Sequence, residues 1–327
     1  MYLKVGRVFF LMVRKILVSD AIDLEAFREG IGERSNDFLV DVHPEISAEE
    51  LKAIIKDYDG IVFRSRTKLD QEALSDSNLL CAVRAGNGLD NVHLETANKK
   101  GIQVFNCPEL SKENVADYTL AMLVNLTRNL VKAHLSMLEG KWDRDVLTGS
   151  GFKDKTLGII GLGRIGTEVA LRATAHGMKV IAHDTEKTEE YATKYGVTLV
   201  SLPELLRQSD FLTLHLPLNA KTHRLLNREK ISSFKKGVYI VNSSREQLFD
   251  FPALVEAIKS GQVAGYATDV FEEEPLRSEH ELIKLAKQGY NVLLTPHIGA
   301  QVTEIQQSIA RDSGKKIVQF FDSLGSK

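Results

Sequence analysis

Three kinds of charged side chain follow apolar, strand-like runs in the second half of this sequence. Arg245 follows the run 237–242, a group of acidic residues follows the run 265–269, and His297 follows the run 292–295. Ligands of an open parallel sheet bind at the carboxyl ends of its strands. We therefore expect these side chains to meet at one edge of a sheet.

These side-chain types suit hydride transfer to a 2-oxo acid beside a nicotinamide. An arginine binds a carboxylate and polarises the neighbouring ketone. A histidine donates a proton to the carbonyl oxygen as the hydride arrives. A carboxylate orients the imidazole and favours its protonated form. Taken singly, each charge is an ordinary solvated loop residue, but their common place at strand ends favours a site.

A glycine-rich loop supplies the nucleotide half of this chemistry. Gly161, Gly163 and Gly166 form G-x-G-x-x-G between an apolar run and a helix-like run, and the next apolar run ends at Asp184. This order is that of a dinucleotide-binding βαβ unit, with the pyrophosphate at the helix N-terminus. An acid at the position of Asp184 accepts hydrogen bonds from a ribose diol and repels a 2′-phosphate, which favours NAD over NADP. The alternative is an ordinary tight βα turn.

Two alternations of strands and helices position these residues, and each predicts an α/β unit with a parallel sheet. A long amphipathic helix is expected over 115–138, and a last helix over about 302–321 returns to the first unit. The expected domains are a discontinuous one of residues 12–108 and 299–327 and a nucleotide domain of residues 109–298. The predicted strands are 15–19, 38–42, 60–64, 80–84 and 102–106, then 157–160, 180–183, 198–201, 211–216, 237–242, 265–269 and 292–295.

The composition is that of an ordinary globular protein. The 327 residues are 43% hydrophobic and 26% charged, with a formal net charge of −2, so neither nucleic acid nor a membrane surface is an expected partner. Cys81 and Cys107 lie in apolar runs and are expected to be reduced core residues, which favours the cytoplasm. The histidines show no metal-ligand spacing, and no metal is expected.

The first eleven residues are interpreted as an extension ahead of the folded domain, with Met12 as a possible true start. The apolar part is short for a signal peptide, and Arg14 and Lys15 interrupt it without a small-residue cleavage site. It is also too short to span a bilayer.

These motifs resemble the D-isomer-specific 2-hydroxyacid dehydrogenase family, and within it most resemble D-3-phosphoglycerate dehydrogenases, from about residue 14 onward. The family's arginine matches Arg245. Its glutamate, in Asp-Val-Phe-x-x-Glu-Pro, matches Glu274, and its catalytic histidine, in Pro-His-Ile-Gly, matches His297. The resemblance implies a His–Glu acid/base pair with an arginine anchor. It also implies a Rossmann domain inserted into a flavodoxin-like catalytic domain, and a homodimer built on helix 115–138.

The resemblance also assigns further binding residues. In the loop Arg84–Asn91, backbone amides near Gly86 and Asn87 would bind the substrate carboxylate. Asp269 would lie near the cofactor carboxamide. The remaining positions expected to contact NAD are Arg164 and Ile165 in the glycine loop, His215 and Pro217 in the loop lining the adenosine, and Ser244.

The segment Arg64-Ser65-Arg66 bears on the substrate. Similar loops in phosphoglycerate dehydrogenases contact the substrate phosphate. Arg64 and Arg66 are separated by one residue, so their side chains would lie on the same face if the strand continued through them. A loop conformation would also allow both to reach one phosphate. The alternative is that Arg66 is a solvated surface charge.

Three departures from the family pattern weaken the phosphoglycerate assignment. Glu246 stands where glycine commonly follows the arginine, Asn87 replaces a small or β-branched residue, and Gln301 replaces serine. Glu246 is expected to repel an anionic substrate, to alter the loop, or to point to solvent.

The function expected from the resemblance is an NAD-dependent D-2-hydroxyacid dehydrogenase that converts D-3-phosphoglycerate to 3-phosphooxypyruvate in serine biosynthesis. One alternative is an enzyme of the same class that acts on glyoxylate, hydroxypyruvate, D-lactate or a phosphonate analogue. Another is an NAD-sensing scaffold like the C-terminal-binding-protein corepressors, against which the lack of long disordered tails argues. Since the chain ends soon after the last helix, no serine-binding regulatory domain and no feedback control through one are expected.

Overall fold

A computed structural model describes residues 13–325, so the expected N-terminal extension and Met12 lie outside the described residues. The chain divides into two compact units and crosses between them twice. One unit holds the described residues up to Ser111 and from Val302 onward, and the other holds Lys112–Gln301. Each division lies three residues beyond the one expected from the sequence, 111 against 108 and 301 against 298.

The discontinuous unit is built on a five-stranded parallel sheet with the order β2-β1-β3-β4-β5. This is the flavodoxin-like strand order. Each strand begins and ends within one residue of its predicted position, because the runs are apolar and bounded by polar or turn residues. The strands are β1 (Arg14–Val18), β2 (Phe38–Val42), β3 (Gly60–Phe63), β4 (Cys81–Arg84) and β5 (Gln103–Asn106).

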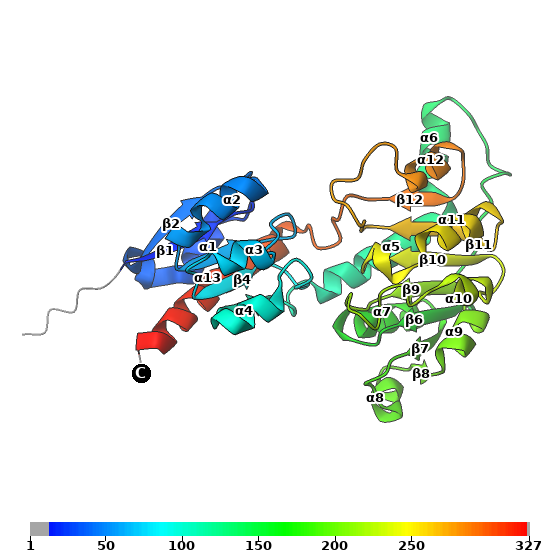
Figure 1. Cartoon of the computed structure of the whole chain (residues 1–327). Helices are drawn as coiled ribbons and strands as arrows, with labels where there is room; N and C mark the ends of the chain where they lie inside the picture. Colours follow the sequence, from blue (N-terminus) through cyan, green and yellow to red (C-terminus); the bar gives the residue numbers. More distant parts are fainter. Residues whose placement is uncertain (1–12, 326–327) are drawn as a thin grey trace, which may run out of the picture. The chain divides into compact units, whose positions relative to one another are not determined.

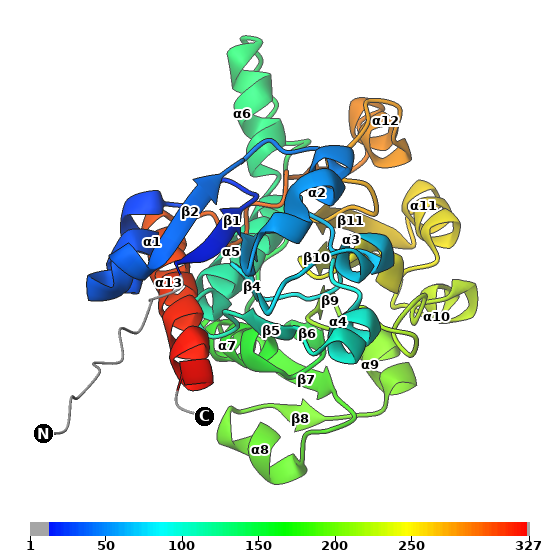
Figure 2. The ribbon, with the colours of Figure 1, turned by 60° about the vertical axis from the view of Figure 1, so that its left-hand side comes forward.

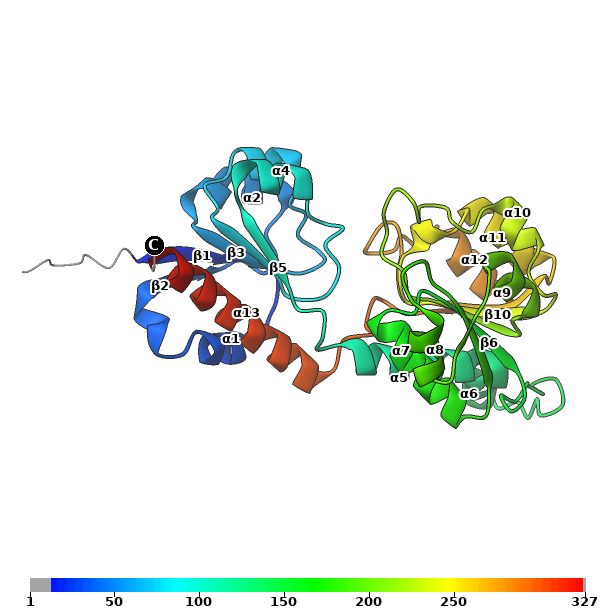
Figure 3. The ribbon, with the colours of Figure 1, turned by 90° about the horizontal axis from the view of Figure 1, so that it is seen from below.

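Helices cover both faces of this sheet (Figure 3). On β1, Ile16 and Val18 pack under α1 and α13, whereas Leu17 packs on the opposite face under the other helices. The alternation follows from the two-residue period of a strand that is buried on both faces. The C-terminal helix α13 lies along α1, far from it in sequence (Figure 2). The helices are α1 (Leu24–Ile31), α2 (Ala48–Ile54), α3 (Gln71–Ser75), α4 (Leu94–Lys100) and α13 (Thr303–Gly325).

The inserted unit contains a seven-stranded parallel sheet with the order β12-β11-β10-β9-β6-β7-β8 (Figure 1). The order runs outward in both directions from β6, and β9 pairs with β6 at the switch point, as in the Rossmann fold. The strands are β6 (Thr156–Ile160), β7 (Lys179–His183), β8 (Thr198–Leu199), β9 (Phe211–Leu214), β10 (Val238–Asn242), β11 (Val263–Thr268) and β12 (Val292–Leu294).

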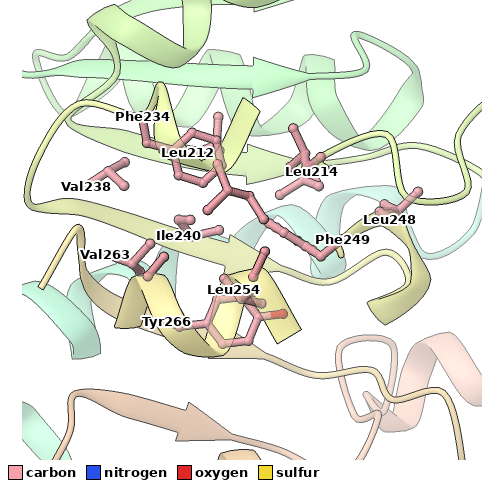
Figure 4. Packing of buried hydrophobic residues seen from close by; sticks show 14 of the residues in the cluster. Leu212, Leu214, Phe234, Val238, Ile240, Leu248, Phe249, Leu254, Val263 and Tyr266 are labelled. Atoms are coloured by element: carbon pink, nitrogen blue, oxygen red, sulfur yellow. The ribbon is translucent and has the colours of Figure 1, made fainter. Parts of the chain in front are cut away.

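Two apolar clusters sandwich this second sheet. Leu212, Ile240 and Tyr266 point to the face covered by α9 to α12 (Figure 4). The next residues, Val241 and Ala267, point to the face covered by α5, α7 and α8. The helices are α5 (Lys112–Arg128), α7 (Arg164–Ala175), α8 (Glu189–Lys194), α9 (Leu202–Gln208), α10 (Arg228–Ser232), α11 (Phe251–Lys259) and α12 (Glu281–Lys287).

The single long helix expected over 115–138 is wrong. The segment forms α5 and a separate helix α6 (Leu130–Leu138), because Asn129 between them adopts a left-handed conformation with φ of 52°. Asparagine tolerates this conformation better than most residues. The Asn125 side chain then accepts a hydrogen bond from the backbone N–H of Val131 at 3.3 Å. Within residues 13–325, no helix is long and apolar enough to cross a bilayer.

Candidate active site

The glycine loop joins β6 to α7, and its first and third glycines are required by packing. Gly161 has φ of +95°, and a Cβ there would lie 2.6 Å from the carbonyl oxygen of His215. A Cβ on Gly166 would lie 2.1 Å from the carbonyl oxygen of Gly161. Gly163 is the N-cap of α7 and has no side-chain cap, so a ligand can approach the amides of the first turn, where Arg164 and Ile165 stand.

Asp184 follows β7 and lies against the glycine loop. Its Oδ2 accepts a hydrogen bond from the backbone N–H of Leu162 at 2.7 Å. Its Oδ1 accepts from the backbone N–H groups of Glu186 and Lys187, at 2.8 and 3.1 Å. The carboxylate therefore holds the loop in addition to the ribose contact expected from the sequence.

We expect Asp184→Ala to lower kcat/KM for NADH about 10- to 100-fold while kcat/KM for NADPH falls less or rises. The reason is that the variant loses both an acceptor for the ribose diol and the repulsion of a 2′-phosphate. Steady-state kinetics with both cofactors measure the ratio, and Glu186→Ala, an exposed acid two residues away, is the control. If the ratio of kcat/KM for NADH to kcat/KM for NADPH did not change, the assigned role of Asp184 would be wrong.

The loop after β9 places His215 and Pro217 beside the glycine loop. The backbone N–H of His215 donates to the carbonyl of Ile160 at 2.8 Å. Burial lowers the pKa of His215 to about 3, so the ring is neutral at physiological pH. Its Nε2 is buried and has no hydrogen-bond partner among the described residues.

Arg245 follows β10 in a loop whose backbone is tightly bonded. The buried Asn242 side chain donates to the carbonyl of Arg245 at 2.9 Å and accepts from the N–H of Ser244 at 3.0 Å. The Ser244 hydroxyl donates to the carbonyl of Leu214 at 2.6 Å. Arg245 Nη1 donates to the carbonyl of Ser244 at 2.5 Å. The sequence analysis missed Asn242, although an asparagine that ends a buried strand is a recognisable signal.

His297 and Glu274 form a hydrogen-bonded pair. The Nδ1 atom of His297 lies 2.8 Å from Oε2 and 3.0 Å from Oε1 of Glu274. About a third of each side chain is exposed, 34% for the histidine and 32% for the glutamate. With Glu274 as the acceptor, Nδ1 carries the hydrogen and Nε2 is left for a ligand.

His297 and Arg245 both favour the ionised form of Glu274. Burial raises the pKa of Glu274, but the hydrogen bond and charge of His297, the N–H of Phe271 and the charge of Arg245 together lower it below its usual value. Glu274 is therefore ionised at neutral pH. Arg245, Glu274 and His297, predicted from three separate strand ends, are brought together within the inserted unit.

Asp269 holds the backbone that carries His297. Its carboxylate is buried and accepts hydrogen bonds from the Thr295 hydroxyl at 2.6 Å and from the N–H groups of Ile298 and Gly299 at 2.9 and 2.8 Å. These bonds stabilise the left-handed conformation of His297, whose φ is 56°. The sequence analysis placed Asp269 at the cofactor carboxamide and missed this second role.

In the discontinuous unit, the Gly86 loop is bonded internally. The N–H of Gly86 donates to the carbonyl of Arg84 at 2.8 Å, and its carbonyl accepts from Cys107 at 2.7 Å. Its φ is +154°, and a Cβ there would displace the guanidinium of Arg84, so glycine suits this position. Because the Gly86 amide is already used, the contact expected with a substrate carboxylate stays a prediction for Asn87, which is exposed.

The strand does not continue through Arg64 and Arg66, because β3 ends at Phe63, so these residues lie in a loop, the other conformation that the sequence left open. The loop is shaped instead by Asp20, which accepts from the N–H groups of Arg64 and Thr67 at 2.5 and 3.3 Å. Asn91 donates to the carbonyls of the same two residues at 2.7 Å each. Both holding residues were missed by the sequence analysis.

The two guanidinium groups contact different partners. Arg64 Nη1 donates to the carbonyl of Ala21 at 3.3 Å, and burial lowers the pKa of Arg64. Arg66 Nη1 lies 3.2 Å from Oε2 of Glu45 in a pair whose side chains are 48% and 88% exposed. A pair this exposed contributes little stability, so a phosphate can displace it. Ser65, between them, is exposed.

The departures from the family pattern lie in different environments. Asn87 and Gln301 are exposed. Glu246 does not point to solvent, because its residue is only 4% exposed and its Oε2 accepts from the N–H of Glu272 at 2.8 Å.

The fold and the site define the class of this protein: a two-unit α/β protein with a dinucleotide-binding Rossmann unit that also carries an Arg–Glu–His group. The chain belongs to the D-isomer specific 2-hydroxyacid dehydrogenase family. The profile of that family's NAD binding domain matches residues 120–299.

Individual relatives agree with this family. The chain is 40% identical over 312 residues to a D-3-phosphoglycerate dehydrogenase of Methanocaldococcus jannaschii, covering 93% of this chain but 57% of that protein. It is 39% identical over 314 residues to a hydroxypyruvate reductase of Thermotoga maritima, covering 95% of this chain and 98% of the other. It also resembles the structure of a D-lactate dehydrogenase from Aquifex aeolicus complexed with NAD and lactic acid, with a TM-score of 0.82, 29% identity and coverage of 94% and 95%.

Proposed function

We propose that this protein is an NAD-dependent D-2-hydroxyacid dehydrogenase whose preferred substrate pair is D-3-phosphoglycerate and 3-phosphooxypyruvate, in serine biosynthesis. The observation that carries the dehydrogenase proposal is the His297–Glu274 hydrogen bond of 2.8 Å beside Arg245 in the Rossmann unit. Relatives named D-3-phosphoglycerate dehydrogenase support the choice of substrate.

The proposed roles follow from the geometry of the side chains. Bound NADH supplies the hydride to the carbonyl carbon of the 2-oxo acid. His297 donates the proton on Nε2 to the carbonyl oxygen, while Nδ1 stays bonded to the ionised Glu274, which stabilises the imidazolium before the transfer. Arg245 binds the carboxylate and polarises the ketone. In the oxidative direction, neutral His297 accepts the hydroxyl proton.

The cofactor contacts are proposed on the same basis. The amides at the start of α7 would bind the pyrophosphate, Asp184 the ribose diol, and the His215–Pro217 loop the adenosine. Ser244 and Asp269 lie in the loops that follow β10 and β11, next to the reacting groups, and are assigned to the nicotinamide side. The packing that excludes a side chain at Gly161 and Gly166 supports the pyrophosphate site at the start of α7.

The substrate is tested by NADH oxidation with 3-phosphooxypyruvate, hydroxypyruvate and glyoxylate. We expect the phosphorylated acid to have a kcat/KM roughly 10- to 100-fold above the others, because a charge-assisted phosphate contact is worth about 1.5–3 kcal/mol. Arg66→Ala should remove most of that preference while leaving the two unphosphorylated acids unchanged. Lys68→Ala, an exposed cation two residues on, is the matched control.

A general 2-oxo acid reductase is the second candidate. A relative that this chain matches over nearly its whole length is named hydroxypyruvate reductase, and the arginines of the 64–66 loop contact different partners. Equal or better use of hydroxypyruvate and glyoxylate would establish this function in place of the phosphoglycerate activity. A protein that binds NADH and turns over none of these acids would instead behave as an NAD-sensing scaffold.

We also propose that the protein is a homodimer, formed through α6 and the segment after it. No residue of α6 is buried in the chain, and its large apolar side chains are exposed. Among them, Leu135 is 52% and Leu138 is 71% exposed, as expected of a face that a second copy covers. Sedimentation equilibrium measures the state, and a monomer at micromolar concentration would contradict the proposal.

A further inference from the structure

Glu246 occupies a buried place between two loops of the site. It follows Arg245 directly and begins the short 3-10 helix Glu246–Leu248. At 4% exposure it is more buried than either Glu274 or His297. An ionisable side chain is rarely this buried unless polar partners hold it, so those partners indicate what it does.

The first partner is a backbone group of the opposite loop. Oε2 of Glu246 accepts the N–H of Glu272 at 2.8 Å, two residues before Glu274. This hydrogen bond therefore links the loop that carries Arg245 to the loop that carries Glu274. A shift of either loop has to stretch this bond.

The second neighbour is His280, the N-cap of α12. Its Nδ1 accepts the N–H of Leu282 at 3.4 Å, so the hydrogen of the neutral ring is on Nε2. That Nε2 lies 3.5 Å from Oε1 of Glu246. The pKa of His280 is lowered, mainly by burial. The ring lies against Phe251 and Phe271. The imidazole therefore lies near Oε1 of Glu246, an oxygen that is buried and makes no hydrogen bond within residues 13–325.

Two further acids of the site disfavour the ionised form of Glu246. The titratable groups around it are Glu272 and Glu274 on the 271–275 loop, His280 before α12, and Tyr266 on β11, with Arg245 next to it in the chain. Burial first, and then the two acids, raise the pKa of Glu246 above its usual value despite the bond from the N–H of Glu272. Keeping this carboxylate ionised thus costs stability.

We propose that Glu246 is a positioning residue, which fixes the Arg245 loop to the Glu274 loop and adds a second negative charge to the Glu274–His297 pair. This inference rests on the proposed dehydrogenase function. It explains how the chain tolerates a carboxylate where its family commonly has glycine: the side chain turns inward, away from the anionic substrate, and bridges the two loops.

Two variants separate the bridge from the charge. Glu246→Gln keeps an oxygen acceptor for the N–H of Glu272 and removes the charge. We expect its KM for the 2-oxo acid to stay within about twofold, while the alkaline limb of kcat/KM for reduction moves to lower pH by roughly half a unit. Glu246→Gly removes the bridge as well, and its kcat/KM should fall roughly tenfold through the misplacement of Arg245 and Glu274. NADH binding should be unchanged in both.

Stability gives a readout that does not depend on turnover. Because the pKa of Glu246 is raised in the folded protein, its contribution to stability is full below the unfolded pKa and is lost as the pH rises through the folded pKa. Glu246→Gln removes this loss, so its melting temperature should gain on the wild type as the pH rises above about 4.5. Glu273→Gln, an exposed acid paired with Arg277 at 3.0 Å on the same loop, is the matched control.

The outcomes distinguish the inference from the function on which it rests. An active wild type with both Glu246 variants matching Glu273→Gln in kcat/KM and pH profile would overturn the role of Glu246 alone. A wild type that binds NADH and reduces none of the acids would overturn the proposed function, and the positioning role with it. If Glu246→Gln had the pH profile of the wild type while Glu246→Gly lost activity, the bridge between the two loops would be supported and the role of the charge would be refuted.

Discussion

Replacing His297 with alanine should lower kcat for reduction of any 2-oxo acid by about 10²- to 10⁴-fold. The variant loses the group that donates the proton, and the remaining Arg245 and cofactor contacts supply binding without an acid. The NADH dissociation constant, measured by fluorescence titration, should stay within about twofold, because the glycine loop and Asp184 lie on other strands. Stopped-flow measurement of NADH oxidation gives the chemical step.

The control for this prediction is a histidine on the surface. His223→Ala removes an exposed imidazole from the loop after β9 and should keep wild-type kinetics. Turnover of His297→Ala within tenfold of the wild type would show that the acid/base assignment is wrong. Loss of NADH binding together with turnover would point to a collapsed loop instead, since the left-handed backbone of His297 depends on Asp269.

Glu274→Gln probes the same pair from the other side. Glutamine can still accept from Nδ1 but carries no charge, so it stabilises the imidazolium less and kcat should fall about tenfold. Because the pKa of Glu274 is lowered, its contribution to stability is present above the unfolded pKa near 4.5 and is lost as the pH falls through the folded value. Glu274→Gln should therefore lose stability relative to the wild type at neutral pH but not in acid, as thermal unfolding at several pH values would show.

The sequence was sufficient to predict the framework of this fold, because its strands are short apolar runs bounded by polar residues. On β1, Ile16, Leu17 and Val18 are all fully buried, which is the pattern of a strand covered on both faces. The glycine loop could also be predicted, because packing leaves no space for a side chain at Gly161 or Gly166. Burial on both faces of a strand and close packing at a glycine each restrict the residue type at a single position, so the sequence shows them directly.

What the sequence did not reveal depends on a partner distant in the chain. Asp269 was assigned to the cofactor, and its second role, accepting the N–H groups of Ile298 and Gly299 some thirty positions later, was not predicted. Similarly, the turn at the end of β3 is set by Asp20 and Asn91 and not by the arginines themselves. Residue type and spacing identify a carboxylate at a strand end but not which backbone amide it binds.

The break at Asn129 has a different cause. The residues on either side of it are helix formers with an amphipathic pattern, so periodicity predicts one helix over 115–138. One residue in the left-handed conformation redirects the chain and leaves α6 with no buried residue. An isolated asparagine is too common within helices to predict such a turn.

Arg245→Ala should lower kcat/KM for 2-oxo acids by about 10²- to 10³-fold, the second large effect expected at this site. The guanidinium binds the substrate carboxylate in the ground state and stabilises charge on the carbonyl oxygen in the transition state, so both KM and kcat should suffer. Arg245→Lys should recover only part of the loss, because an ammonium cannot make the planar paired contact. Its backbone is held by Asn242, so the substitution need not disturb the loop.

The pattern across substrates makes this prediction specific. Arg245 would meet the carboxylate that all 2-oxo acids share, so the loss should be similar for phosphorylated and unphosphorylated acids, whereas Arg66→Ala should affect only the former. Arg228→Ala, which removes an exposed arginine paired with Glu256, is the control for general charge effects. If Arg245→Ala stayed within tenfold of the wild type, or impaired only the phosphorylated acid, Arg245 would not be the carboxylate anchor. In the second case the phosphate would bind at the end of β10 in the inserted unit, and Arg66 would be left as a solvated surface charge.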